Sequence, residues 1–71
     1  MSPVRKRSVT IRGHRTSYSL EDAFQGELER ITTERSTSLA ALIAAIDEGR
    51  PRDTNLSSAL RLFVLDAVRK G

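Results

Sequence analysis

Apolar residues recur with helical spacing in three segments of the chain. Intervals of three and four residues predict helices over about 21–35, 38–48 and 56–69. In the third segment, Leu62 and Leu65 fall outside the main apolar face, so the middle of that helix is apolar nearly all round. Such a helix is usually buried on more than one side, which favours packing against its own chain and against a partner. The three apolar faces are made by Phe24, Leu28 and Ile31, by Leu39, Leu42, Ile43 and Ile46, and by Leu56, Ala59, Leu60, Phe63, Val64, Ala67 and Val68.

Polar residues and a glycine mark the predicted helix ends. Ser19, with an acid three residues later, has the spacing of a capping box and predicts the start of the first helix. Ser38 and Asn55 are the predicted N-caps of the second and third helices, because their side chains accept hydrogen bonds from free backbone N–H groups. Gly49, with a proline two residues beyond, predicts the end of the second helix.

Ahead of the first helix the apolar period changes to two, which is typical of an extended chain. A glycine at position 13 interrupts this region, and the apolar residues change parity across it. One flat strand would put them on opposite faces, so we expect the glycine to make a bulge or a turn between two extended pieces, over about 8–12 and 14–20. The odd-numbered set is Val9 and Ile11, and the even-numbered set is Thr16, Tyr18 and Leu20.

The pattern as a whole predicts a mainly α-helical protein with one N-terminal strand. Residues 1–7 show no apolar period and are expected to form a flexible basic arm. Residues 8–71 are expected to form a single domain, in which a strand over about 14–20 precedes the three helices.

Composition makes association with another chain the expected source of extra stability. A domain of 71 residues is marginal without disulfides, a metal or a partner. The chain has no cysteine and one histidine, which excludes disulfides and both thiolate and histidine-cluster metal sites. We therefore predict a homo-oligomer, with no metal and no cofactor.

Positive charge is concentrated at the start of the chain. Five of the 12 basic residues precede the first acidic one, Glu21, and from Glu21 onward the chain has nine acids and seven bases. A basic segment on a near-neutral body attracts polyanions, of which nucleic acid is the first candidate and an anionic membrane surface the second. A basic tail that serves only solubility is the third explanation. The five residues are Arg5, Lys6, Arg7, Arg12 and Arg15.

Other functional classes have little support in the sequence. No stretch is long and apolar enough to span a bilayer, and the N-terminus lacks the apolar core of a signal peptide, so we expect a soluble cytoplasmic protein. The chain has no Gly-rich phosphate loop and no catalytic constellation of known spacing, so we do not expect an enzyme.

Three stretches of the chain resemble the ribbon-helix-helix family of Arc- and methionine-repressor-like proteins, and most closely a bacterial subgroup known only by that domain. They are Lys6-Arg-Ser-Val-Thr-Ile-Arg-Gly-His-Arg-Thr-Ser17, Ser38-Leu-Ala-Ala-Leu-Ile43 and Asn55-Leu-Ser-Ser-Ala-Leu-Arg-Leu-Phe-Val-Leu65. The resemblance implies a homodimer in which each chain gives one strand to an intermolecular two-stranded antiparallel ribbon. The ribbon of such proteins enters the major groove of double-stranded DNA.

By this resemblance, alternate side chains of the ribbon strand divide between DNA and core. Arg15, Ser17 and Ser19 would face the bases, and Thr16, Tyr18 and Leu20 would face the helices. Arg15 suits a bidentate contact with guanine, and serine hydroxyls donate or accept at several bases. The family also binds a phosphate at the start of its second helix, which here would involve the backbone N–H groups of Ser38 and Leu39.

The chain departs from the family pattern in two ways. A third helix follows the two that define the fold, and the extended region is longer than one ribbon strand requires. Arg12 and His14 are therefore further candidates for DNA contact, and Arg5, Lys6 and Arg7 are expected to touch phosphates rather than bases.

The function expected from these features is transcription regulation. A homodimeric, sequence-specific repressor would act by occupying its operator, and dimers would be free to assemble further on DNA. The alternative is an antitoxin-type or other interaction module whose C-terminal helix binds a partner protein. Membrane-surface binding is the weakest option, because it leaves the ribbon pattern unexplained.

Overall fold

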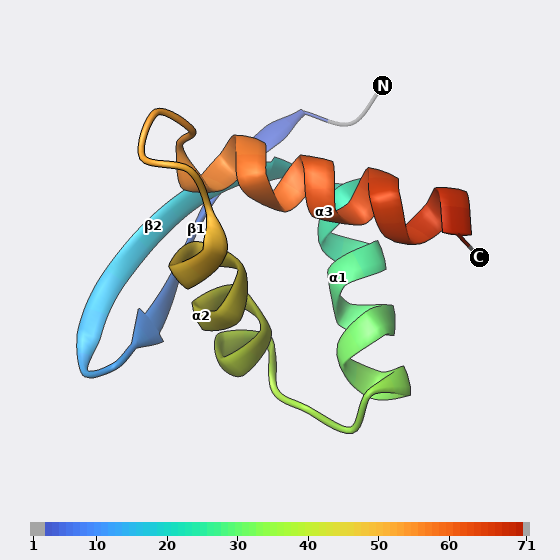
Figure 1. Ribbon diagram of the computed structural model, residues 1–71, viewed down its shortest axis with the longest axis horizontal. Coiled ribbons are helices and arrows are strands. Elements are labelled where there is room, and N and C mark those ends of the chain that lie inside the picture. Colours follow the sequence, from blue (N-terminus) through green and yellow to red (C-terminus); the bar gives the residue numbers. More distant parts are fainter. Residues whose placement is uncertain (1–2, 71) are drawn as a thin grey trace.

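The computed structural model describes residues 3–70 and contains two strands followed by three helices (Figure 1). No helix within residues 3–70 is long and apolar enough to cross a membrane. The predicted order of a ribbon and two helices, with an additional C-terminal helix, is confirmed. The elements are β1 (Val4–Ile11), β2 (His14–Glu21), α1 (Asp22–Glu34), α2 (Leu39–Gly49) and α3 (Leu56–Lys70).

The two strands of the ribbon belong to the same chain. β1 and β2 pair antiparallel from Ile11 opposite His14 to Val4 opposite Glu21, which leaves a two-residue loop. Both loop residues, Arg12 and Gly13, have positive φ angles, 50° and 80°. This is the type I′ geometry whose twist matches that of the flanking strands.

The prediction of one strand per chain in an intermolecular ribbon is therefore corrected. A tight turn at Gly13 brings the two extended pieces against each other, so the chain completes the ribbon alone. The predicted flexible arm over 1–7 is also wrong for Val4–Arg7, because these residues pair with β2. Pro3 precedes the strand, and the first two residues of the predicted arm lie outside the described part of the chain.

The turn also explains the change of parity in the sequence. Opposite residues of an antiparallel pair share a face, and in this register odd positions of β1 lie opposite even positions of β2. Ile11, Tyr18 and Leu20 are buried on one face, and Val9 and Thr16 are half-buried there. The expectation that Thr16, Tyr18 and Leu20 face the helices is met by this alternation.

The first helix begins later than its predicted cap. α1 starts at Asp22, and its N-cap is Glu21, whose side chain makes no capping hydrogen bond. Ser19 lies two residues before the end of β2, and its backbone is used in contacts with α3. The predicted capping role of Ser19 is therefore wrong, because the strand continues through this position.

The other two predicted caps are confirmed. Ser38 Oγ accepts a hydrogen bond of 3.1 Å from Ala41 N at the start of α2. Asn55 Oδ1 accepts one of 2.8 Å from Ser58 N at the start of α3. Both bonds satisfy a backbone donor that the first helical turn leaves free.

One hydrophobic core joins all three helices to the inner face of the ribbon. Four fully buried leucine or isoleucine side chains meet there, one each from β2, α1, α2 and α3. The third helix is therefore part of the fold and not an appendage to it. These side chains are Leu20, Leu28, Ile43 and Leu60.

Candidate nucleic-acid interface

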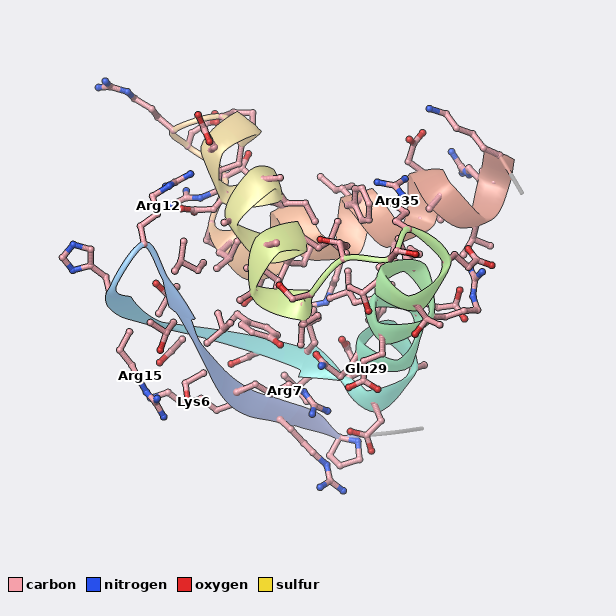
Figure 2. All side chains as sticks on the ribbon, turned by 90° about the horizontal axis from the view of Figure 1, so that it is seen from below. Lys6, Arg7, Arg12, Arg15, Glu29 and Arg35 are labelled. Atoms are coloured by element: carbon pink, nitrogen blue, oxygen red, sulfur yellow. The ribbon has the colours of Figure 1, made fainter. Side chains whose placement is uncertain are left out.

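The face of the ribbon that points away from the helices carries two cationic and several hydroxyl side chains (Figure 2). In the register of the hairpin, the pairs on this face are Lys6 with Ser19, Ser8 with Ser17, and Thr10 with Arg15. We call these six residues the outer face. All are exposed except Ser19, which is half-buried.

The geometry of the outer face follows from strand alternation. Residues two apart in β1 and in β2 point to the same side, so hydroxyls and cations from the two strands are interleaved. Arg15 Nη2 donates a hydrogen bond of 3.3 Å to Ser8 Oγ, which directly links the strands across this face. Figure 2 shows Lys6 and Arg15 directed away from the helices, whereas Arg35 lies on the opposite side of the molecule.

The sequence-based prediction identified only half of the outer face. Arg15, Ser17 and Ser19 lie where the outward parity of β2 places them. Ser8 and Thr10, from β1, were missed as members of the same face, and Lys6 was assigned to a phosphate-binding arm. The sequence shows these polar residues alternating with Val9 and Ile11. This alternation places them beside Arg15 and Ser17 only once the turn at residues 12–13 is known.

Ser19 is attached to α3 through its backbone. Its N–H donates to Ser57 Oγ at 2.9 Å, and its carbonyl oxygen accepts from Arg61 Nη2 at 3.3 Å. Arg61 also pairs with Glu21 at 3.1 Å. A hydrogen bond to its own backbone N–H and the Arg61 guanidinium hold the pKa of Glu21 below its ordinary value. This end of the ribbon is therefore fixed to the start of α3.

Two of the three basic residues at the start of β1 point toward the helices instead of joining the outer face. Arg5 and Arg7 both contact Asp22 Oδ1, at 3.2 and 2.7 Å. Lys6, between them, lies on the outer face. The predicted phosphate-contacting trio is thus divided by strand alternation, with one cation outside and two paired beside the start of α1.

The turn of the hairpin is held against the second helix. Arg12 Nη2 lies 2.8 Å from Glu48 Oε2 and 3.5 Å from the carbonyl oxygen of Ala44. A cation near the C-terminal end of a helix is favourable because it faces the negative end of the helix dipole. His14 is exposed directly after the turn.

Among the described residues, no hydrogen bond links the predicted phosphate site at the start of α2 to the outer face. Ser38 uses its hydroxyl to cap its own helix, and Leu39 packs partly against the core. Because Arg12 contacts the C-terminal part of α2, it is that end of the helix which lies at the hairpin turn. The helix start in contact with the ribbon is that of α3, through Ser57.

A chain of hydrogen bonds runs from the buried face of the ribbon to an exposed acid of α1. Tyr18 OH donates to Gln25 Oε1 at 2.9 Å, and Gln25 Nε2 donates to Glu29 Oε2 at 3.0 Å. Burial raises the pKa of Tyr18, so the phenol stays neutral. The expectation that Tyr18 belongs to the core, and is not a stacking platform for bases, is confirmed.

The described residues contain no cluster of three or more histidine, cysteine or acidic side chains able to hold a metal ion. A comparison with family models matches residues 4–68 to the ribbon-helix-helix domain. No curated protein and no solved structure matched the chain in the corresponding comparisons.

Proposed function

From the premise that the chain belongs to the ribbon-helix-helix domain family, we propose that it is a sequence-specific regulator of transcription that binds double-stranded DNA. The family typically comprises DNA-binding regulators and antitoxins, and its domains bind DNA as dimers. The protein acts as a homodimeric repressor in the bacterial cytoplasm, and it excludes polymerase by occupying its operator.

The outer face of the hairpin is the observation that carries this proposal. A two-stranded antiparallel ribbon fits the major groove of B-DNA, which is about 12 Å wide. On the outer face, Lys6 and Arg15 offer cationic donors, and the hydroxyls between them both donate and accept. None of these six residues is acidic, and Glu21, which strand alternation places next on the same face, is paired with Arg61 at 3.1 Å.

Individual roles follow from side-chain chemistry. Arg15 reads a guanine through its two parallel N–H donors, with Ser8 holding the guanidinium in place. Ser17 contacts an adjacent base edge, and Lys6 is long enough to reach either a guanine or a phosphate. Ser19 makes a smaller contribution, because it is half-buried beside α3.

Phosphate contacts come from groups around the ribbon. The Arg12–Glu48 pair is more than half exposed on both sides, and such pairs contribute about 0–1 kcal/mol. Arg12 can therefore exchange Glu48 for a phosphate at little cost, and exposed His14 lies next to it. Arg5 and Arg7 would have to leave Asp22 to act in the same way, and Ser38 and Leu39 remain the proposed backbone donors of a helix-start contact.

The antitoxin alternative is less well supported. In that reading, the C-terminal helix exists to bind a partner protein. Leu60 is fully buried and Val64 is nearly so, both in the core shared with the ribbon. A partner that pulled α3 out of the domain would expose this core, so only the outward side of the helix is open to a partner protein.

The test is duplex binding across a salt series, with a sequence selected from a random pool. The logarithm of the binding constant should fall linearly with the logarithm of salt, by about 0.9 per phosphate neutralised. Arg15→Ala should retain salt-dependent binding but lose about 1–3 kcal/mol of discrimination between selected and random duplexes.

Arg35→Ala is the matched control, since it removes the same charge from the side away from the outer face (Figure 2). It should leave both affinity and discrimination unchanged. Wild-type protein that binds no duplex at low salt, or Arg15→Ala protein that discriminates as the wild type does, would refute the proposal.

A further inference from the structure

The side of α3 that faces away from the core is apolar along much of its length. Leu62, Leu65 and Val68 are 60%, 45% and 51% exposed, respectively. Their spacing of three residues puts them along one side of the helix, in a stripe that we call the α3 stripe. With Val4 on the ribbon, they are the most exposed large apolar side chains of the described residues.

A shallow apolar hollow lies on each side of the α3 stripe. One, of about 240 Å³, lies between α3 and the start of α1 and is lined by Ala23, Phe24, Val64, Leu65 and Val68 with one acid. The other, of about 290 Å³, lies toward the end of α2 and is lined mainly by Ile46, Pro51, Ala59, Leu62 and Phe63. Leu62 belongs to the lining of one hollow, and Leu65 and Val68 belong to the lining of the other.

We propose that the α3 stripe is the surface through which two copies of this chain form a homodimer. A two-fold axis places the same patch on both subunits, so the patch must be complementary to itself. We expect the α3 stripe to meet this requirement, with an exposed leucine of one copy packed against an apolar hollow of the other. Because the two strands of the ribbon already pair within one chain, the ribbon itself does not require a strand from a second copy.

Two carboxylates near the α3 stripe, Asp66 and Glu27, are paired with cations. Asp66 and Lys70, on the same helix, are paired with each other at 3.1 Å. Glu27, the acid of the hollow beside α1, is paired with Arg30 at 2.8 Å. The contact therefore requires no lone carboxylate to lose its solvent, which would be costly.

The α3 stripe supplies the apolar centre of the proposed interface and not its whole area. At the exposed fractions above, the three side chains of the α3 stripe contribute on the order of 270 Å² per chain, about a third of the roughly 800 Å² per partner in a standard interface. The linings of the two hollows and the flanking helix surfaces add to this. We therefore expect dissociation in the micromolar range.

The dimer leaves the DNA-binding surface free. The α3 side chains that form hydrogen bonds with the ribbon are those of Ser57 and Arg61, and neither belongs to the α3 stripe. Two copies joined through α3 would each present an outer face. The inference deepens the proposed function by identifying its partner surface, but it can fail independently because dimerisation is measured without DNA.

The experiment is sedimentation velocity of the full chain over a concentration series from about 1 to 500 μM. Wild-type protein should pass from 7.9 kDa to twice that mass. Leu65→Lys should weaken association at least tenfold, whereas Val4→Lys should leave it unchanged. Val4 is 53% exposed and apolar but lies on the ribbon, so it is a matched control for a new surface charge.

Wild-type protein that stays monomeric throughout, or Leu65→Lys protein that dimerises as well as the wild type, would overturn the inference. Circular dichroism verifies that each variant is folded, as expected for exposed positions. A monomeric wild type that still binds DNA in an Arg15-dependent way would refute the α3 dimer and leave the DNA-binding function standing.

Discussion

Replacing Gly13 by alanine tests whether a tight turn joins the two strands within one chain. Gly13 has a φ of 80°, in the left-handed region that side chains with a Cβ atom disfavour. No other part of the described chain lies within 4 Å of the position that a Cβ would occupy. Any loss of stability in Gly13→Ala would therefore come from backbone conformation and not from a steric clash.

The magnitude follows from two opposing effects. The left-handed conformation costs a residue with a Cβ about 1–2 kcal/mol. Restricting the unfolded chain offsets about 0.4–1 kcal/mol of that cost. The net loss should be about 1 kcal/mol, which lowers the melting temperature of a domain of this size by about 4–8 °C.

Gly26→Ala is the matched control, with the opposite expected sign. Gly26 lies inside α1, has no positive φ, and likewise has open space where a Cβ would stand. Alanine should stabilise the helix there by about 1 kcal/mol.

Both variants are measured by urea and thermal denaturation at one protein concentration, followed by circular dichroism. If Gly13 instead lay in an extended arm or an interchain strand, alanine would be neutral or slightly stabilising. Equal responses of the two variants would therefore refute the hairpin turn.

Two further predictions concern the ribbon support and a helix start. Tyr18→Phe removes the hydrogen bond to Gln25 and should cost about 1 kcal/mol near neutral pH. Because burial raises the pKa of Tyr18, its contribution to wild-type stability should be constant below its unfolded pKa of about 10 and fall as the pH rises above it. Alkaline denaturation should show this fall weakened in Tyr18→Phe, and identical curves would contradict it. Ser38→Ala should lose about 1 kcal/mol of stability in urea titrations, because α2 loses its N-cap. Ser38→Asp can still accept the hydrogen bond and should retain most of the stability. Equal losses in the two variants would rule out the capping role.

Features determined by neighbouring residues could be predicted from the sequence. The capping bonds of Ser38 and Asn55 each span three residues, so the residue type and its position before an apolar run were sufficient. The predicted helix limits agree with the observed ones to within about a residue, because apolar periodicity and the Gly49 stop are local signals.

Features determined by distant contacts could not be predicted in the same way. Ser19 has the spacing of a helix cap, but its backbone N–H binds Ser57, which is 38 residues away. The change of parity at Gly13 fits a bulge as well as a turn, and it contains no information on which chain supplies the second strand. Without the hairpin register, Ser8 and Thr10 have no visible connection to Arg15.

The ion pairs of Arg5 and Arg7 with Asp22 could not be predicted for a similar reason. Arg5, Lys6 and Arg7 form a run of like charge in the sequence, which is typical of a solvated arm. Strand pairing sends alternate side chains to opposite faces, and Asp22 then receives the two that point inward. Composition favours negatively charged partners, but it does not show which of these cations pair with Asp22.

The most direct test of the DNA-binding surface is residue-by-residue NMR of the labelled protein during titration with its selected duplex. Amide and side-chain shifts should change most on the outer face, at Lys6, Ser8, Arg15 and Ser17, with smaller changes at the α3 stripe. Shifts that concentrate on α1 or α3 while the hairpin stays unperturbed would contradict the account.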